Sequence, residues 1–375
     1  MNALEMPMME TKKLGFGLMR LPKKGLGTDV EQTSRMVDMF LEAGCTYFDT
    51  AHVYPGSEDA IGKALVARHP RESYTLATKL FGPIAFNEKM ARGQFQTSLD
   101  RTGAGYIDYY LMHTLMHNNY RRYEKLHMWD FALEMKDKGL IKHVGFSFHD
   151  GPELLEEILK THPEAEFVQL QLNYADWENP SVQSRANYEV ARKYGKPIVV
   201  MEPVKGGALA KPPKEVLKLF NEYAPERSAA SWAIRFVASL DGILTVLSGM
   251  SNTAQMEDNL SYMKDFQPLN EEERQIIRKA TEIMGRSSTI PCTSCSYCTK
   301  GCPKQIPIPR IFSAMNKRLG DGQIEEAAAD YAALAAEGAV ADACISCGQC
   351  ENICPQHIGI IEKLKECDKA LRGEA

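Results

Sequence analysis

Between about residue 14 and residue 266 the chain alternates short apolar runs with amphipathic stretches of helical period. Glycine or proline closes several of the helical stretches, and one long expected helix covers residues 123–139. Eight apolar runs predict strands, at residues 14–21, 46–51, 74–80, 107–113, 141–148, 167–174, 197–204 and 243–249. Eight consecutive strand–helix units predict a closed (β/α)8 barrel of about 250 residues, because right-handed crossovers leave few other arrangements.

An open doubly wound sheet is the alternative to this TIM barrel. Such a sheet commonly carries a GxGxxG turn after its first strand, with an acidic residue downstream for a ribose. Residues 15–20, GFGLMR, have neither the glycine spacing nor the acidic partner. The sequence therefore favours the barrel.

The C-terminal part of the chain holds one cysteine phrase, CxxCxxCxxxCP, twice. Three thiolates spaced three residues apart can surround one face of an iron-sulfur cubane, and the fourth, before the proline, reaches the other cluster. The spacing predicts two [4Fe-4S] clusters: the first bound by Cys292, Cys295, Cys298 and Cys354, the second by Cys344, Cys347, Cys350 and Cys302. Two structural zinc sites are the alternative, but tetrahedral zinc needs only two CxxC pairs.

The pattern around these cysteines predicts a separate module. Residues 270–285 predict a connecting helix, and residues 308–320 and 324–338 are strong helix formers. We therefore expect a barrel at residues 1–266, a connecting helix and turn at 267–290, and a small, mainly helical ferredoxin-like domain at 291–375. The fold class is α/β with this second domain appended.

Composition limits the partners and the compartment. The 375 residues are 44% hydrophobic and 25% charged, and a net charge of -5 gives no general attraction for nucleic acid or an anionic membrane. No apolar window approaches the length of a spanning helix, and the N-terminus lacks a signal-peptide pattern. Eight of the ten cysteines lie in the two phrases, which suits a reducing interior, so a cytoplasmic protein is expected.

Residues 286–318 carry six basic residues and no acidic one. These cations could offset the charge of the clusters or dock an acidic electron partner, a ferredoxin or a flavoprotein. A solvated face is an equally good interpretation, because runs of charge are common on protein surfaces. The residues are Arg286, Lys300, Lys304, Arg310, Lys317 and Arg318.

Four polar residues arrive at one rim of the predicted barrel. Asp49 ends the second strand, Tyr54 lies in the loop that follows, Lys79 ends the third strand and His113 ends the fourth. The C-terminal rim of such a barrel is where catalytic groups gather. These four residues are therefore a candidate active site.

The four residue types support acid catalysis on a carbonyl. A phenol with a reference pKa of about 10 is a poor acid near neutrality, but a neighbouring ammonium favours its phenolate and makes the proton easier to donate. Lys79 would supply that charge and Asp49 would hold Lys79 in place. His113 would donate a hydrogen bond to the carbonyl oxygen that Tyr54 protonates.

The segments DTAHVY, LATKL and YYLMH resemble the tetrad segments of the aldo-keto reductase family, over residues 13 to about 265. The resemblance implies hydride transfer between NADPH or NADH and a small-molecule carbonyl substrate. It also implies that Asp49, Tyr54, Lys79 and His113 are the tetrad. The substrate class would be an aldehyde, a ketone or a conjugated carbonyl.

The same resemblance implies the nicotinamide contacts. Ser147 and Gln169 match the family's carboxamide binders, and Asp258 and Asn259 match the adenine end. The turns after the seventh and eighth strands are where barrels commonly seat phosphate. These turns contain Gly206, Gly207, Ser248, Gly249 and Asn252.

The sequence departs from the family pattern at four positions. Phe148 stands where the family often has asparagine, and Met201 stands where an aromatic ring commonly stacks on nicotinamide. Gly249 and Gln255 stand where NADPH-selective members carry Lys and Arg, so the ribose phosphate would lack its usual cations. The choice between NADPH and NADH stays open at this point.

The tetrad and the clusters together predict an iron-sulfur oxidoreductase of the aldo-keto reductase type, in which the clusters exchange electrons with a partner or with the substrate. Hydride carries two electrons and each cluster passes one, and no flavin motif is visible to convert between them. One alternative is an electron-transfer subunit whose barrel is only a docking scaffold, and another is a redox sensor. The sequence leaves the oligomeric state open.

Overall fold

The computed structural model describes residues 12–25, 27–286 and 289–373. Residues 1–11 and 26 of the predicted barrel, two residues of the predicted turn and the last two residues lie outside these ranges. The chain divides into two compact units. The first comprises residues 1–178, 183–203 and 230–274, and the second comprises residues 179–182, 204–229 and 275–375.

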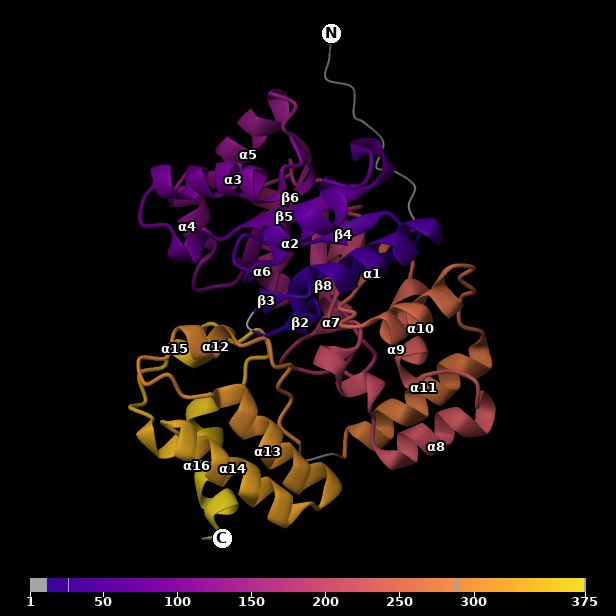
Figure 1. Ribbon diagram of the computed structural model, residues 1–375, viewed down its shortest axis with the longest axis vertical. Helices are drawn as coiled ribbons and strands as arrows, with labels where there is room; N and C mark the ends of the chain where they lie inside the picture. The colour runs from indigo at the N-terminus through magenta and orange to yellow at the C-terminus, as the bar shows by residue number, and fades with distance from the viewer. Residues whose placement is uncertain (1–11, 26, 287–288, 374–375) are drawn as a thin grey trace. The chain divides into compact units, whose positions relative to one another are not determined.

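The first unit is a closed barrel of parallel strands (Figure 1), in the order β1-β10-β9-β8-β7-β6-β5-β4. The predicted TIM barrel is confirmed, and each of its strands falls within or close to an expected one. Buried positions run along the whole of several strands, as expected for a parallel sheet covered on both faces. The strands are β1 (Leu14–Gly17), β4 (Tyr47–Asp49), β5 (Thr75–Leu80), β6 (Ile107–Leu115), β7 (Ile141–Phe148), β8 (Phe167–Gln171), β9 (Ile198–Met201) and β10 (Ile243–Ser248).

Helices follow the strands, and a small antiparallel hairpin, β2 (Lys23–Lys24) with β3 (Gly27–Thr28), precedes the first helix. The long helix expected at residues 123–139 is two helices, because His127 between them has a left-handed backbone with φ 50°. The helices are α1 (Val30–Glu42), α2 (Ser57–Ile61), α3 (Glu88–Thr102), α4 (Tyr120–Lys125), α5 (Met128–Asp137), α6 (Pro152–Thr161), α7 (Ser184–Lys193), α9 (Ala229–Ala238) and α10 (Thr253–Met263).

Local sequence explains where these helices begin and which face they bury. The Asp29 carboxylate accepts a hydrogen bond from the Gln32 amide at 3.0 Å and so caps the N-terminus of α1. In α6, Pro152 occupies the first turn, and Leu155 and Ile158 turn the apolar face inward. The barrel interior is filled by alternate strand residues, among them Tyr47, Tyr109, Leu111, Phe167, Val199 and Leu247.

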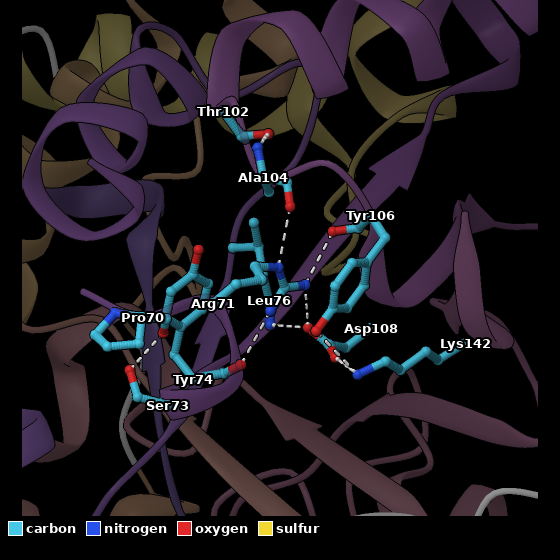
Figure 2. A network of polar contacts seen from close by, with 10 residues as sticks. All are labelled: Pro70, Arg71, Ser73, Tyr74, Leu76, Thr102, Ala104, Tyr106, Asp108 and Lys142. Atoms are coloured by element: carbon cyan, nitrogen blue, oxygen red, sulfur yellow. Dashed lines mark hydrogen bonds and ion pairs between the residues drawn. The ribbon is translucent and has the colours of Figure 1, made fainter. Parts of the chain in front are cut away.

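Figure 2 shows an ion-pair network that joins the N-terminal ends of β5, β6 and β7. The buried Asp108 carboxylate accepts from Arg71 Nη2 at 2.6 Å, from Lys142 Nζ at 2.8 Å and from the Leu76 amide at 2.9 Å. The Arg71 guanidinium also lies 3.7 Å from the ring centroid of Tyr106. The network lies at the end of the barrel opposite the rim at which β4, β5 and β6 end. We therefore infer that its role is to stabilise the fold.

Asp108→Asn is expected to lower the free energy of unfolding by about 3 kcal/mol, because it leaves two cations facing a buried amide. Glu31→Gln is the control. The side chains of Arg35 and Glu31 are 57% and 73% exposed, so their ion pair should contribute less than about 0.5 kcal/mol to the free energy of unfolding. Urea unfolding followed by circular dichroism measures both changes. Equal losses in the two variants would contradict this assignment.

The second unit is mainly helical, as the sequence predicts. Its core joins α13, α14 and α16 through buried side chains that include Ile311, Phe312, Tyr331 and Leu364. The helices are α8 (Lys214–Tyr223), the continuation of α11 (Glu271–Met284), α12 (Tyr297–Lys300), α13 (Ile308–Asp321), α14 (Ile324–Glu337), α15 (Gln349–Asn352) and α16 (Ile360–Arg372). The predicted division of the chain at residues 266 and 290 stays a prediction, and the compact units cut the sequence differently.

None of the helices in the described part of the chain has the length and apolar character needed to cross a membrane.

Candidate functional site

The four rim residues lie together at the C-terminal ends of adjacent strands. Lys79 Nζ donates to Asp49 Oδ1 and to the Thr50 carbonyl oxygen, each at 2.6 Å. The same Nζ lies 5.3 Å from the ring centroid of Tyr54. The Tyr54 ring in turn faces the His113 ring, with 5.8 Å between centroids. One hydroxyl, one amine, one carboxylate and one imidazole thus form a continuous group.

Burial sets the electrostatics of this group. Asp49 is 3% exposed and Lys79 is 1% exposed. Burial raises the pKa of the Asp49 carboxyl and lowers the pKa of the Lys79 amine, and the attraction between the two opposes both shifts. The proton affinities of amine and carboxylate therefore approach each other. Shifts of this kind are typical of a site through which protons pass, and a buried ion pair adds little stability of its own.

His113 is held as a neutral imidazole. Burial, together with the charge of Lys79, lowers the pKa of His113 well below its ordinary value. The Phe81 ring packs edge-on against it, with 5.5 Å between centroids. A neutral imidazole can donate a hydrogen bond to a carbonyl oxygen without competing with Tyr54 as the acid.

Strand β6 is distorted just beyond His113. Its pairing with β7 shifts between Met112 and Leu115, and Thr114 has φ 59°, which is unusual for a β-branched residue. The Thr114 amide donates to Ser147 Oγ at 2.7 Å, and the carbonyl of His113 accepts from the Tyr123 hydroxyl. This strained backbone sets the direction of β6 at its C-terminal end, directly after His113.

Ser147 and Gln169 lie side by side on β7 and β8, at paired positions of the ladder. They are 1% and 2% exposed. The neighbouring Gln169 side chain, after the Lys79 amine, helps to hold the pKa of the Asp49 carboxyl down against burial. Among the described residues the Gln169 amide oxygen has no hydrogen-bond partner. A buried acceptor beside a serine hydroxyl fits a primary carboxamide, which has one donor group and one acceptor.

Two other predicted cofactor residues contact each other. Asn259 Nδ2 donates to Ser248 Oγ at 2.6 Å, and Asn259 Oδ1 accepts from the Tyr262 hydroxyl. Asn252 caps the N-terminus of α10 by accepting from the Gln255 amide at 2.9 Å. These contacts order the turn after β10, which is where the sequence predicts a phosphate.

The remaining predicted contacts are spread more widely. Phe148 is buried at the end of β7, Met201 is half-buried at the end of β9, and Gly249 is exposed directly after β10. Asp258 lies half-buried on α10 beside Asn259. Gly206 and Gly207 have φ values of 65° and 105° and belong to the second compact unit.

The eight phrase cysteines surround two hollows in the second unit. Both groupings match the crossed ligand sets predicted from the spacing. The first hollow is lined by Cys292, Cys295, Cys298 and Cys354, and the second by Cys302, Cys344, Cys347 and Cys350. Burial raises the pKa of Cys298 to about 12 and of Cys350 to about 11, so these thiols need the positive charge of bound iron to become thiolates.

The sequence repeat is also a repeat of backbone conformation. Equivalent positions in the two phrases have positive φ: Ser294 and Ser346, Ser296 and Gly348, and Gln305 and His357. No three acidic, histidine or cysteine side chains in residues 12–25, 27–286 and 289–373 are placed to hold a single metal ion. A hollow ringed by sulfurs suits a polynuclear cluster better than a lone zinc ion.

Sequence reasoning did not identify several supporting groups of the rim site. The Thr50 carbonyl, the Phe81 ring and the Tyr123 hydroxyl all contact tetrad residues. Thr50 lies inside the DTAHVY segment, so that segment could have suggested it. Tyr123 comes from a different helix, and no local pattern signals its contact.

Comparison with known proteins finds a matching family for each of the two predicted parts of the chain. The model of the aldo/keto reductase family matches residues 13–282, and the model of the 4Fe-4S dicluster domain matches residues 291–358. An aldo-keto reductase from Mycolicibacterium paratuberculosis is 30% identical over 258 residues, which is 67% of this chain and 81% of that protein. Aldo-keto reductase str7 from Strobilurus tenacellus is 31% identical over 52% of this chain and 59% of its own length.

Solved structures show the same barrel. Aldo-keto reductase AKR11C1 from Bacillus halodurans, in its holo form, is 27% identical with a TM-score of 0.57, over 72% of this chain and 92% of that chain. An aldo/keto reductase from Klebsiella pneumoniae, in complex with NADP and acetate, shares the fold at 17% identity, with a TM-score of 0.59, over 72% of this chain and 91% of that chain. The chain therefore belongs to the aldo/keto reductase family of oxidoreductases and continues into a 4Fe-4S dicluster domain.

Proposed function

We propose that this protein reduces a small carbonyl compound, an aldehyde, ketone or conjugated carbonyl, with NADPH or NADH, and that its two clusters exchange electrons one at a time with a partner. The observation that carries the proposal is the buried Asp49–Lys79 pair beside Tyr54 and His113. An ion pair that is costly to bury is expected where chemistry needs it.

Tyr54 is the proposed proton donor. As the carbonyl oxygen gains negative charge, the Tyr54 hydroxyl donates its proton, and the charge of Lys79 stabilises the phenolate that remains. The neutral His113 ring donates a hydrogen bond to the same oxygen and fixes its position. The substrate carbon is reduced by two electrons, and the oxygen takes one proton.

Asp49 and Thr50 keep Lys79 directed at this site. Both accept from Nζ at 2.6 Å, which leaves the third ammonium proton for the tyrosine side. Because burial lowers the pKa of Lys79, its ammonium can return a proton to the Tyr54 oxygen after each turnover. The amine then regains a proton from water.

The nicotinamide site is proposed on the fit of the buried carboxamide binders. The Gln169 oxygen would accept from the carboxamide nitrogen, and the Ser147 hydroxyl would donate to its oxygen. A bound reduced nicotinamide would supply the hydride. Gly249 and Gln255 offer no cation for a 2′-phosphate, so the preference between NADPH and NADH rests on other groups.

The eight phrase cysteines are the proposed ligands of the two [4Fe-4S] clusters, in the crossed sets that line the two hollows. Each bound cluster would carry one electron at a time. Cys45 and Cys367 are buried elsewhere and have no part in this proposal.

Anaerobic assays of a carbonyl panel test the proposal. The purified protein, with clusters intact, should oxidise NADPH or NADH in step with alcohol formation for at least one aldehyde or ketone. Cys344→Ser should leave that turnover within about twofold while it abolishes electron exchange with a reduced ferredoxin. A protein that binds neither nicotinamide in a fluorescence titration would instead support the scaffold alternative.

A further inference from the structure

The two cysteine phrases, although repeated in sequence and backbone, sit in different surroundings. Thr293 and Ile345 are equivalent, since each follows the first cysteine of its phrase. Thr293 is 2% exposed, whereas Ile345 is 57% exposed. The same contrast extends to the ligands, because Cys347 is exposed and its counterpart Cys295 is half-buried. The two cluster sites therefore differ in what can reach them.

The first phrase is held on two sides within the second unit. The side-chain amide of Asn316, on α13, accepts from the Ile290 amide at 2.7 Å and donates to the Ile290 carbonyl at 2.8 Å. On the other side Gly206 packs so closely that a Cβ there would lie 2.6 Å from Thr293 Cα. Gly206 belongs to the turn η5 (Lys205–Ala210), which begins four residues after β9 ends.

This contact explains the glycine. A side chain at position 206 would collide with the backbone of Thr293, next to the ligand Cys292, and only glycine permits the approach. The turn that follows β9 is thus part of the support of the first cluster site. Gly322, which follows α13 in the same unit, has nearly the same φ of 68°, but a Cβ there would meet nothing within 4 Å.

The second phrase presents an open, apolar surface beside one exposed lysine, Lys304. Ile345, Ser346 and Cys347 are exposed in succession, and so are Pro303 and Lys304, which also line the second hollow. Lys304 is the only charged residue that lines this hollow. Two other cations of the basic run, Arg310 and Lys317, pair with Glu337 and Asp330.

We propose that the two cluster sites have different roles: the second is the surface at which an acidic one-electron carrier protein docks, and the first is the inner site, seated on the turn after β9. The inference rests on the proposed electron exchange. In each encounter the carrier loses one electron and the second cluster gains it, with no proton or atom transferred. An exposed isoleucine beside an exposed ligand and a lysine offers apolar contact and charge complementarity to an acidic carrier.

Stopped-flow absorbance tests the docking surface, with a reduced acidic [2Fe-2S] ferredoxin as the carrier and dithionite as a small reductant. Ile345→Asp should slow cluster reduction by ferredoxin about tenfold and leave reduction by dithionite unchanged. Ile324→Asp is the matched control, because Ile324 is 54% exposed in the same unit but does not line either hollow. It should match the wild type with both reductants.

If Ile345→Asp loses iron, Lys304→Glu takes its place with the same expected result. Equal rates with ferredoxin for the wild type and the Ile345 or Lys304 variant would overturn the docking surface, as would a wild type that ferredoxin does not reduce. Carbonyl reduction with NADPH is measured separately on the wild type. Its absence would count against the proposed function and not against the docking surface.

Iron analysis and electron paramagnetic resonance test the inner site. Gly206→Ala should displace Thr293, so that the spectrum of the first cluster changes or is lost while the second remains. Gly322→Ala, which adds the same methyl group at nearly the same φ but without a contact, should retain both clusters. Two unchanged clusters in Gly206→Ala, or an equal loss of iron in both variants, would show that the turn after β9 does not support the first cluster site.

Discussion

Tyr54→Phe is expected to lower kcat for carbonyl reduction by about 10³-fold, because it removes the hydroxyl that donates the proton and leaves the ring in place. Nicotinamide binding should stay within about twofold, since the Ser147 and Gln169 side chains are unchanged. Steady-state kinetics with the best carbonyl of the panel, together with a fluorescence titration of NADPH, measures the two effects.

The matched control is Tyr188→Phe, whose hydroxyl donates to the Asp241 carbonyl on the outside of the barrel. It should retain full activity. Lys79→Met should reproduce the loss seen in Tyr54→Phe, and the double variant should be no worse than either single one, because the two groups act as a unit. A loss of less than about tenfold in Tyr54→Phe would mean that another group donates the proton.

Paired cysteine substitutions are expected to separate the two clusters along the crossed ligand sets. Cys298→Ser with Cys354→Ser removes two ligands from one hollow and should leave about half the iron, with one intact cluster. Cys350→Ser with Cys354→Ser removes neighbours in sequence that line different hollows and should damage both clusters. Iron and sulfide analysis of anaerobically purified protein gives the count.

Cys367→Ser is the control for these pairs, since Cys367 is fully buried on α16 and lines neither hollow. Its iron content should equal that of the wild type. The opposite pattern, with one intact cluster in the Cys350–Cys354 pair and two damaged clusters in the Cys298–Cys354 pair, would show that each phrase binds its own cluster.

The features that the sequence predicted correctly are those with a regular spacing. The strands appear as apolar runs, so the barrel and the meeting of Asp49, Lys79 and His113 at one rim follow from the order of the chain. The cysteine phrase has a fixed period, and the cysteines line the two hollows in the grouping expected from it. That each group binds a cluster stays a prediction.

The features that escaped prediction depend on contacts between distant segments. The sequence around Thr114 does not indicate its positive φ, because that conformation depends on a register shift between β6 and β7. The close approach of Gly206 to Thr293 joins residues that are far apart in the chain. A glycine after a strand end indicated a turn, and only the folded structure shows which backbone the turn meets.

The difference in solvent exposure between the two cysteine phrases could not be predicted from their spacing, because exposure depends on which other segments cover each phrase. Thr293 and Ile345 occupy the same place in the repeat, and a threonine and an isoleucine are both common in half-buried positions. Thr293 is 2% exposed and lies against the backbone of the turn at Gly206, whereas Ile345 is 57% exposed.

The most direct test of the central claim is an isotope measurement. NADPH deuterated at C4 is incubated anaerobically with the protein, its clusters oxidised, and a carbonyl substrate, and the alcohol is analysed by mass spectrometry. We expect one deuterium on the carbinol carbon of the alcohol, and we expect the Tyr54→Phe variant to form the same product far more slowly. If alcohol forms only in a parallel incubation with reduced clusters, and carries no deuterium, hydride transfer from the nicotinamide is contradicted.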